Sequence, residues 1–493
     1  TMTKILKTSR ISANRLRLPL LAVAVAVAVA VLAGCASLSP DGNVSDVQAL
    51  VAGKTGGVEA PLAAGKQPGA DADAIVGELL AAPLSAESAV RIALLNNPGL
   101  RGSLSTLGVS DALRVQAGTL PNPHFAIGRF RQGDEVEIER LLTFNLVGLL
   151  TLPWKYQWQN QQHELAKLQA AQDVIRLAAS TRKAWISAVA AQQTALYMAD
   201  VKDAAEAGGE LARRMARVGN WSKLRQAREQ VTLNDATAQL ARAQQAAFAA
   251  RERLTRLMGL WGTQTNFTLA ERLPDLPKDA TTMADVESRA LRERLDVRSA
   301  IAESRYLAGQ MGFTKVTGYF DGMTIGVGRS SVFDNAAQTK ESRRGVELEL
   351  PLPIFDWGGA RNARSVAMYL QSATRVQEVA VNARSEAREA YFSYRTAYDL
   401  ARHYRDEVVP LRKFIGEEMV LRYNGMLASA WDLLADSRAQ VMAVNSTIEA
   451  QRDFWLAEAD LQTALTGTSP GALAGMTSGS AGSGGGGDAA AGH

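Results

Sequence analysis

Two long tracts with helical periodicity dominate the pattern of apolar and polar positions in this chain of 493 residues. Residues 155–257 contain no proline, and residues 362–465 contain one, Pro410. A glycine turn interrupts each tract near its middle, at Gly219 and at Gly425. At 1.5 Å per residue, the helix before Gly219 would be about 90 Å long. Such a helix belongs to a coiled coil, a membrane bundle or the wall of a tube.

The first tract is too polar for lipid, and its apolar positions are mostly alanine, as in "KLQAAQDVIRLAASTRKAWISAVAAQQ". Small residues allow close packing on more than one side of a helix. A helix in a tube wall has two helical neighbours and two wet faces, which suits this pattern better than a single leucine seam does. We therefore favour a tube wall, with an antiparallel coiled-coil hairpin as the alternative.

Two pairs of strand-like runs precede these tracts, and a short polar loop joins each pair into a predicted hairpin. The first hairpin, "PHFAIGRFR" and "VEIERLLTFNLVGLLTLP", falls in residues 123–153. The second, "GYFDGMTIGVGRS" and "GVELELPLP", falls in residues 316–353. From Val346 to Leu350, aliphatic side chains alternate with glutamates. This alternation suits a wall between lipid and a wet lumen.

The order helix, hairpin, helix, turn, helix occurs twice, so the chain is a duplicated half-protein. The first copy, 84–273, opens with "LSAESAVRIALLNNPGLRGS", in which Ser85 is the expected helix N-cap. The second copy, 274–467, opens with "MADVESRALRERLDVRSA". The long helices are expected to end at the glycine C-caps Gly259 and Gly467.

Each copy also contains a strand-to-helix corner, "VGLLTLPWKYQWQNQQHE" in the first and "VELELPLPIFDWGGARNARS" in the second. Prolines end a strand ladder and glycines permit a bend. The predicted corner residues are Pro153, Pro351, Pro353, Gly358 and Gly359. Nearby aromatic residues are candidates for a membrane-interface belt, with core packing as the alternative; they are Phe125, Trp154, Tyr156, Trp158, Phe355 and Trp357.

Four strands are too few to close a membrane barrel, because such barrels begin near eight strands. Several chains must therefore contribute strands to one barrel. Three chains would supply twelve strands, and about twelve helices for the tube.

Composition excludes several functional classes. Hydrophobic residues make up 47% of the chain, charged residues 21%, and the net charge is +4, part of it in the N-terminal leader. Nucleic acid is therefore not an expected partner. One cysteine and four histidines give neither a disulfide framework nor a metal cage. No nucleophile elbow or phosphate loop occurs, so we predict no enzyme activity, cofactor or metal.

The N-terminus has the pattern of an export signal. Basic residues precede the apolar run "LPLLAVAVAVAVAVLAGC", which predicts a signal peptide over residues 1–34. Its last four residues, "LAGC", resemble the lipobox of bacterial lipoproteins. This resemblance implies a covalent lipid on Cys35 and, because Ala36 follows, an outer-membrane address. Residues 35–83, rich in Gly, Ala, Pro and Asp, are expected to form an extended lipidated tether or a wrapping segment. The alternative for Cys35 is a buried thiol. The Gly/Ser-rich tail, 468–493, is predicted to be disordered.

Over residues 84–467 the chain resembles the TolC-like outer-membrane efflux proteins, particularly the lipidated channels of tripartite resistance-nodulation-division pumps. The segments that carry the resemblance are "ALLNNPGL", the repeated hairpin, "PLPIFDWGGARNA", "VGNWS" and "RYNGMLASAWDLLADSR". The resemblance implies a mixed α+β membrane protein. The assembly that it implies is a homotrimer. A 12-stranded outer-membrane β-barrel would continue into a 12-helix periplasmic α-barrel with an equatorial domain.

The same resemblance implies a passive conduit in the outer membrane that extends into the periplasm. Its partners would be a periplasmic adaptor (membrane fusion) protein, an inner-membrane pump of the resistance-nodulation-division type and outer-membrane lipid. Two alternatives are a type I protein secretion conduit and, from another class, a lipid-anchored periplasmic coiled-coil structural or adaptor protein.

The candidate site lies at the two glycine turns of the helical tracts. By resemblance, Asp432 occupies a gate position, and three copies around an axis would form an anionic constriction that favours cations. A solvated helix aspartate is the alternative. Leu427 would form the apolar part of the gate. Relatives carry a charge after it, where this chain has Ala428.

Lys223 occupies a facing position that is acidic in relatives. We hypothesise that Lys223 pairs with Asp432 in a latch that contributes about 1 kcal/mol or less. The turn residues that match adaptor-contacting positions are Val218, Gly219, Asn220, Tyr423, Asn424 and Gly425.

Overall fold

The computed structural model describes residues 37–59, 62, 70–317, 322–352 and 354–470. The leader 1–34, Cys35, Pro353 and residues 471–493 lie outside these ranges. The chain divides into two compact units: unit 1 comprises residues up to Gly42, Gly108–Glu164 and Arg305–Tyr369, and unit 2 comprises the remainder. Each sequence copy contributes a segment to both units. The units are thus built from halves of each copy and do not coincide with the copies.

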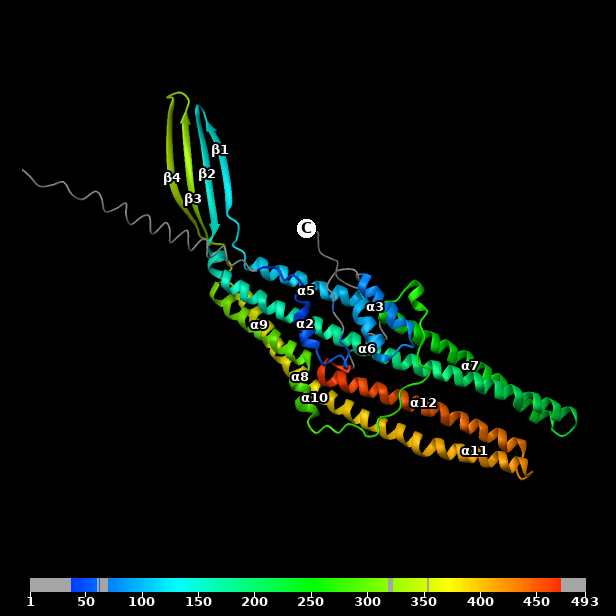
Figure 1. The fold of residues 1–493 in the computed structure, drawn as a ribbon. Helices are drawn as coiled ribbons and strands as arrows, with labels where there is room; N and C mark the ends of the chain where they lie inside the picture. Colours follow the sequence, from blue (N-terminus) through cyan, green and yellow to red (C-terminus); the bar gives the residue numbers. More distant parts are fainter. Residues whose placement is uncertain (1–36, 60–61, 63–69, 318–321, 353, 471–493) are drawn as a thin grey trace, which may run out of the picture. The chain divides into compact units, whose positions relative to one another are not determined.

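Unit 1 contains one antiparallel four-stranded sheet in the order β1-β2-β3-β4 (Figure 1). The strands are β1 His124–Gln132, β2 Glu135–Asn145, β3 Thr324–Asp334 and β4 Thr339–Glu349. Both predicted hairpins are confirmed. Pairing of β2 with β3 joins the strands of the two sequence copies in one sheet.

The first strand-to-helix corner differs from the prediction. Strand β2 ends at Asn145 and helix α6 (Leu146–Arg217) begins at once, so Pro153 lies inside a helix and ends no strand. Asn145 Oδ1 accepts the Gly148 N–H at 2.6 Å, and the Leu146 N–H makes a last bond of 3.0 Å to the Met323 carbonyl. The run from Leu146 to Leu152 is almost uniformly apolar, so its pattern fits a strand and a helix equally.

The second corner is a true connection. Strand β4 ends at Glu349, Pro351 follows it, and helix α10 (Gly359–His403) begins after Gly358. Gly358 has φ +75°, a conformation that favours glycine. Its N–H donates to Asp356 Oδ1 at 2.8 Å and its carbonyl accepts the Asn362 N–H at 2.9 Å. The predicted start of this hairpin, residue 316, lies instead in helix α9, which ends at Thr317.

The remaining helices account for most of unit 2, and several of the long ones continue into unit 1. None of the helices in the described ranges is both long and apolar enough to cross a membrane. The helices not yet bounded are α2 Val44–Val51, α3 Ala70–Ala81, α4 Ala86–Asn96, α5 Pro98–Ala117, α7 Lys223–Met258, η1 Gly262–Thr265, α8 Val286–Glu293, α9 Leu295–Thr317, α11 Val409–Asn424 and α12 Ala430–Thr466.

A π-helical turn, η2 (Tyr404–Val408), lies between α10 and α11. Pro410 follows it in the first turn of α11. Proline lacks an N–H donor and its ring displaces the preceding turn of a helix. A π-turn accommodates this within a continuous helical path.

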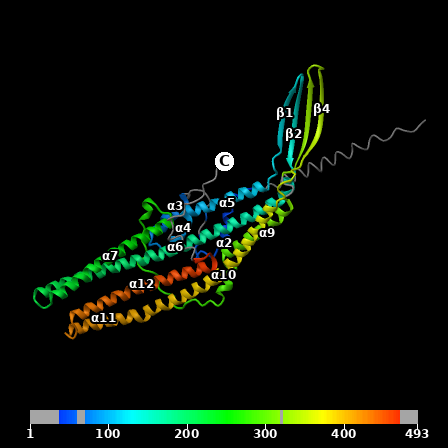
Figure 2. The ribbon, with the colours of Figure 1, turned by 180° about the vertical axis from the view of Figure 1, so that it is seen from behind.

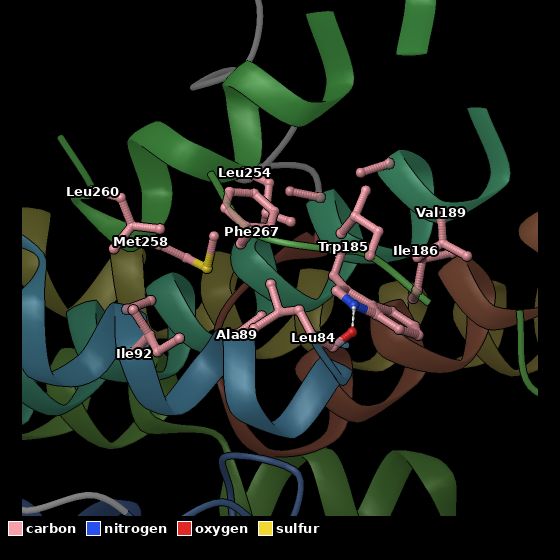
Figure 3. Close-up of a cluster of buried hydrophobic side chains, with 14 of the residues drawn as sticks. Leu84, Ala89, Ile92, Trp185, Ile186, Val189, Leu254, Met258, Leu260 and Phe267 are labelled. Atoms are coloured by element: carbon pink, nitrogen blue, oxygen red, sulfur yellow. Dashed lines mark hydrogen bonds between the residues drawn. The ribbon is translucent and has the colours of Figure 1, made fainter. Parts of the chain in front are cut away.

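A hydrophobic cluster in unit 2 packs α4 against α6 and α7 (Figure 3). Trp185 lies at its centre, and its indole Nε1–H donates to the Leu84 carbonyl at 2.8 Å. Ile92, Leu254 and Met258 are fully buried around it. Burying each such aliphatic side chain contributes roughly 1.5–3 kcal/mol, so the start of the first copy is firmly held by the long helices.

The helix ends confirm two cap predictions and correct a third. Ser85 caps α4, because its side chain accepts the Ser88 N–H at 3.1 Å. Gly259 ends α7 with φ +67°, as a left-handed C-cap glycine does. Gly467 ends α12 with φ −106° and ψ −101°, so it is not a left-handed C-cap glycine. A Cβ there would lie 2.8 Å from Ile175 Cγ2, and close packing explains the residue.

Both predicted chain ends contain buried residues where the structure describes them. The expected tether or wrapping segment, 35–83, contains α2 and α3, and its residues Val47 and Val76 are buried in two of the hydrophobic clusters of unit 2. Apolar positions spaced along these short helices outweigh the Gly-rich composition. The tail predicted to be disordered from 468 begins with a buried Thr468 and with Ser469, whose hydroxyl donates to Glu386 at 2.7 Å.

Candidate functional site: helix turns and sheet faces

The turn between α6 and α7 is built by glycine geometry and a serine cap. Gly219 has φ +77°, and the Asn220 N–H donates back to the Met215 carbonyl at 2.9 Å. Ser222 then caps α7 by accepting the Arg225 N–H at 3.3 Å. The side chains of Val218 and Lys223 are exposed. The turn therefore presents a short mixed surface to solvent in this single chain.

The turn between α11 and α12 bends at a different residue from the one that the sequence indicated. Gly425 has φ −79°, and Met426, one position later, adopts φ +57°. The Leu427 N–H closes the turn on the Arg422 carbonyl at 2.8 Å. Met426 is 94% exposed and Leu427 is 82% exposed. Two large apolar side chains thus project from the end of this helical hairpin, beside the predicted turn residues Tyr423 and Asn424.

Asp432 forms a capping box with Ser429 at the start of α12. Its Oδ2 accepts the Ser429 hydroxyl at 2.7 Å and the Ser429 N–H at 3.0 Å. These side-chain and backbone hydrogen bonds lower the pKa of Asp432 from its ordinary value of 3.8. The carboxylate is therefore charged at neutral pH, and it serves the helix start as well as any gate.

The predicted ion pair between Lys223 and Asp432 is not formed in the described residues of this chain. Ser429 occupies the Asp432 carboxylate instead. A capping box needs no change in helix position, whereas a pair with Lys223 must bring two separate turns together. In this single chain Asp432 thus serves as a helix cap, and the latch at the closed tip of an assembled channel stays a prediction.

A different cluster joins the two helical hairpins, and the sequence analysis missed it. Arg438 on α12 donates to both carboxylate oxygens of Glu229 on α7, at 2.7 and 2.9 Å. The Glu229 side chain is only 3% exposed. The Trp431 ring lies under the guanidinium groups of Arg438 and Arg228, at 5.4 and 6.0 Å. The only sequence signal was the i, i+7 spacing of Trp431 and Arg438, which is common in any helix.

Both views of unit 2 place the α6–α7 and α11–α12 turns at the same end of the unit (Figures 1 and 2). The Glu229–Arg438 pair lies between the hairpins that carry these turns. The two predicted turn sites are therefore brought together at one end, although Lys223 and Asp432 do not pair.

The sheet of unit 1 has two chemically distinct faces. Because residues paired across antiparallel strands point to the same side, the registers assign every strand side chain to one face. The first, here called the carboxylate face, carries Glu135, Glu137, Glu139, Asp334, Glu341, Glu347 and Glu349. The second, here called the apolar face, carries near its helix end Phe125, Leu142, Phe144, Ile325, Val327, Val346 and Leu348.

Strands β1 and β4 are the two edges of this sheet. An edge strand presents a row of unpaired backbone donors and acceptors. Each edge is about ten residues long, with nine residues in β1 and 11 in β4. Long edges of this kind are suited to pairing with another chain.

The aromatic residues near the corners divide into two groups. Phe125, Trp154 and Phe355 are exposed, and Phe355 is 97% exposed. Trp158 instead packs edge-on against Phe313, with ring centroids 4.3 Å apart. Tyr156 accepts a hydrogen bond from Arg114 Nη1 at 3.1 Å. Tyr156 and Trp158 thus have partners inside unit 1, and Trp154 also contacts the Phe313 ring, with centroids 6.4 Å apart. Phe125 and Phe355 keep the belt prediction open.

No group of His, Cys, Asp and Glu in the described ranges is arranged to hold a metal ion. No protein-family model and no curated protein sequence matches this chain. Solved structures do match it. The CmeC outer-membrane channel of Campylobacter jejuni is 14% identical, covers 84% of this chain and 91% of its own, and has a TM-score of 0.62.

Two further structures match over similar lengths. The outer-membrane protein VceC of Vibrio cholerae is 13% identical, with 78% of this chain and 96% of that chain covered and a TM-score of 0.61. The MtrE outer-membrane channel of Neisseria gonorrhoeae in its open state is 20% identical, with 78% and 89% covered and a TM-score of 0.54. The fold is thus mostly helical with one four-stranded sheet. It is the fold of the TolC-like outer-membrane channels.

Proposed function

We propose that this chain is the outer-membrane exit channel of a tripartite efflux system. It would be a passive conduit for substrates that an inner-membrane pump delivers through a periplasmic adaptor. The observation that carries the proposal is the fold match to outer-membrane channels, which covers 84% of this chain and 91% of the CmeC structure. A lipid-anchored coiled-coil protein would have no use for the four-stranded sheet.

The sheet supports assembly into a homotrimer. Both edges, β1 and β4, lack a strand partner among the described residues, and four strands alone cannot close. Pairing β1 of one copy with β4 of the next would give a shared 12-stranded barrel. The carboxylate face would then line a wet lumen and the apolar face would meet outer-membrane lipid. A lipid on Cys35 would add a second anchor.

The helix turns supply the periplasmic end of the proposed conduit. The exposed residues at the two turns, from Val218 to Asn220 and from Tyr423 to Leu427, would contact the adaptor. Asp432 is charged at neutral pH, and its hydrogen bonds with Ser429 lower its pKa further. Three copies around the axis would form a ring of negative charge that favours cations.

Ion conductance through planar lipid bilayers tests this proposal. We expect the purified full chain to form heat-resistant trimers and to conduct ions with a preference for cations. Asp432→Asn should lower the cation-to-anion permeability ratio, because it removes the charge and leaves the side chain nearly unchanged in size. Asp453→Asn, farther along α12, is the matched control. A chain that inserts into bilayers and gives no conductance would rule out the channel.

Lys223→Ala provides a second comparison in the same experiment. Because Asp432 is held by Ser429, removing Lys223 should leave the closed-channel conductance within about twofold of the native value. A large increase in closed-channel conductance would instead support an ion pair between Lys223 and Asp432 that latches the two turns.

A further inference from the structure

Three arginines lie in one row across the apolar face of the sheet. Arg140 on β2 pairs in register with Arg329 on β3, and Arg329 pairs in register with Arg344 on β4. Directly paired residues on neighbouring strands point to the same side with their Cβ atoms about 5 Å apart. All three side chains are exposed. No local pattern in the sequence indicates this row, because its members come from three strands and both copies.

The row separates two chemically different parts of the face. On the helix side of the arginines, the next two rows of the face contain only apolar side chains. The first row is Phe125, Leu142, Val327 and Val346, and the second is Phe144, Ile325 and Leu348. On the side of the hairpin turns, the face adds Arg129, Arg131 and Lys340. The face therefore carries six cationic side chains and no carboxylate, whereas the seven strand carboxylates all lie on the opposite face.

These arginines have no anionic partner in the described part of the chain. The one strand arginine in an ion pair is Arg343, which contacts Glu341 at 3.6 Å on the carboxylate face. Arg329 Nε donates to the neutral Ser342 hydroxyl at 2.9 Å. Like charges directly opposite on adjacent strands destabilise a sheet. A bound anion would offset the repulsion within this row of three.

A hollow of about 610 Å³ lies over this part of the sheet, lined by the three arginines and by apolar neighbours such as Leu142 and Val327. An occupant must therefore present negative charge to one part of the hollow and hydrocarbon to the other. Guanidinium groups bind phosphate through paired hydrogen bonds. A phosphorylated lipid has both required parts in this order.

The spacing along β4 agrees with a membrane boundary. The aliphatic alternation continues from Val346 through Leu348 and Leu350 to Leu352, of which the last two are 49% and 74% exposed. Val346 to Leu352 would extend over about 20 Å at 3.3 Å per residue. At a strand tilt of about 40° this segment covers about 15 Å of the roughly 25 Å apolar band of an outer-membrane barrel. The arginine row lies at the end of this aliphatic alternation, where a headgroup region would begin.

We infer that the Arg140–Arg329–Arg344 row is a binding site for the phosphate-bearing headgroup of an outer-leaflet lipid. The location in the outer leaflet rests on the proposed function, which puts the helices in the periplasm and the hairpin turns outside. Each chain of a trimer would carry one such site.

Binding of a fluorescent diphosphorylated lipid A to the purified full chain in neutral detergent tests the site. We expect the triple variant Arg140→Gln, Arg329→Gln, Arg344→Gln to bind at least tenfold more weakly. Arg343→Gln removes an adjacent arginine from the opposite face and should change binding less than twofold. Lipid A without phosphates should bind the native chain and the triple variant equally. Equal binding of diphosphorylated lipid by native and triple variant would overturn the site.

Three controls keep the result interpretable. Heat-resistant trimers and far-ultraviolet circular dichroism report folding; if the triple variant fails, Arg329→Gln alone should weaken binding severalfold. Inorganic phosphate at millimolar concentration should not displace the lipid, and full displacement would replace the lipid site with a phosphate site. Conductance measured on the same samples tests the channel independently. If the native chain does not conduct but still binds diphosphorylated lipid A more tightly than the triple variant, the proposed function is overturned and the phosphate site stands.

Discussion

Equivalent positions at the start of the two sequence copies perform the same backbone task with different chemistry. Ala93-Leu94 matches Ala290-Leu291, which makes Asn97 the counterpart of Arg294. Asn97 is the C-cap of α4, and its N–H donates to the Ala93 carbonyl. Arg294 is the C-cap of α8, and its N–H donates to the Ala290 carbonyl. The backbone of the duplication is retained to the level of single hydrogen bonds.

The side chains at these positions have diverged completely. Asn97 Nδ2 donates to the Leu257 carbonyl at 2.8 Å and so satisfies the end of α7 with a neutral amide. The Arg294 side chain is 1% exposed and forms ion pairs with Asp296 at 2.6 Å and Glu386 at 2.8 Å. Burial alone would lower the pKa of Arg294, but hydrogen bonds and charge from the two carboxylates raise it. One copy thus depends on amide caps, the other on a buried charge cluster.

Removing Arg294 should have the largest effect of the changes considered. Arg294→Met leaves Asp296 and Glu386 without their cation and should lower the free energy of unfolding by about 3 kcal/mol. Asn97→Ala loses one neutral hydrogen bond and should cost about 1 kcal/mol. Urea unfolding of the full chain in detergent, followed by tryptophan fluorescence, measures both. The control is Arg292→Met, an exposed neighbour on α8. Equal losses for Arg294→Met and Asn97→Ala would remove the contrast between the copies.

The glycines that end α7 and α12, Gly259 and Gly467, provide a second comparison of the two copies, with an expected effect of intermediate size. Gly259→Ala forces a side chain onto φ +67° and puts its Cβ 2.9 Å from the Asn96 backbone oxygen. We expect a loss of about 2 kcal/mol. Gly467→Ala puts its Cβ 2.8 Å from the Ile175 methyl group and 3.2 Å from the Thr463 carbonyl oxygen, and should cost about 1 kcal/mol.

The decisive measurement is rescue by Ile175→Leu, which removes the branched methyl at Cβ. Thermal unfolding should return towards native for the Gly467→Ala double variant and remain low for the Gly259→Ala double variant. Rescue of both, or of neither, would contradict the different roles assigned to the two glycines.

The two helix turns provide the smallest contrast. A left-handed conformation costs an L-residue about 1 kcal/mol, so Met426→Gly should stabilise its turn by up to about 1 kcal/mol. Gly219→Ala should destabilise the first turn by a similar amount. Amide hydrogen exchange at residues flanking each turn measures the local change. Exchange should be slower in Met426→Gly and faster in Gly219→Ala. A change of the same sign in both variants would show that backbone conformation does not control the stability of the turns.

Local patterns in the sequence predicted much of this fold. Alternation identified both hairpins, and the glycine after α7 identified a true C-cap. The position of Pro153 could not be predicted, because the apolar run before it suits strand and helix alike. Pairing of β2 with β3 joins residues almost 200 positions apart, and no local signal specifies it.

Charged positions were the least predictable part of the candidate site. In "RERLDVRSA" several charges lie close together, and nothing in the letters indicates that Arg294 is the buried one. Glu229 and Arg438 likewise look like ordinary residues of a solvated helix face, although their pairing joins two hairpins. Tertiary contacts between distant helices select which charges are buried, and a single sequence does not contain them.

The π-helical turn at Tyr404–Val408 has a consequence for the relation between the two copies. A π-turn holds one more residue than an α-turn, and one residue in an α-helix corresponds to about 100° of rotation. The first copy runs from Leu146 to Arg217 as one α-helix without such an insertion. Side chains of α11 are therefore rotated by about 100° from where an uninterrupted continuation of α10 would place them. The two halves share one order of elements, but only the second contains this change of side-chain direction past His403.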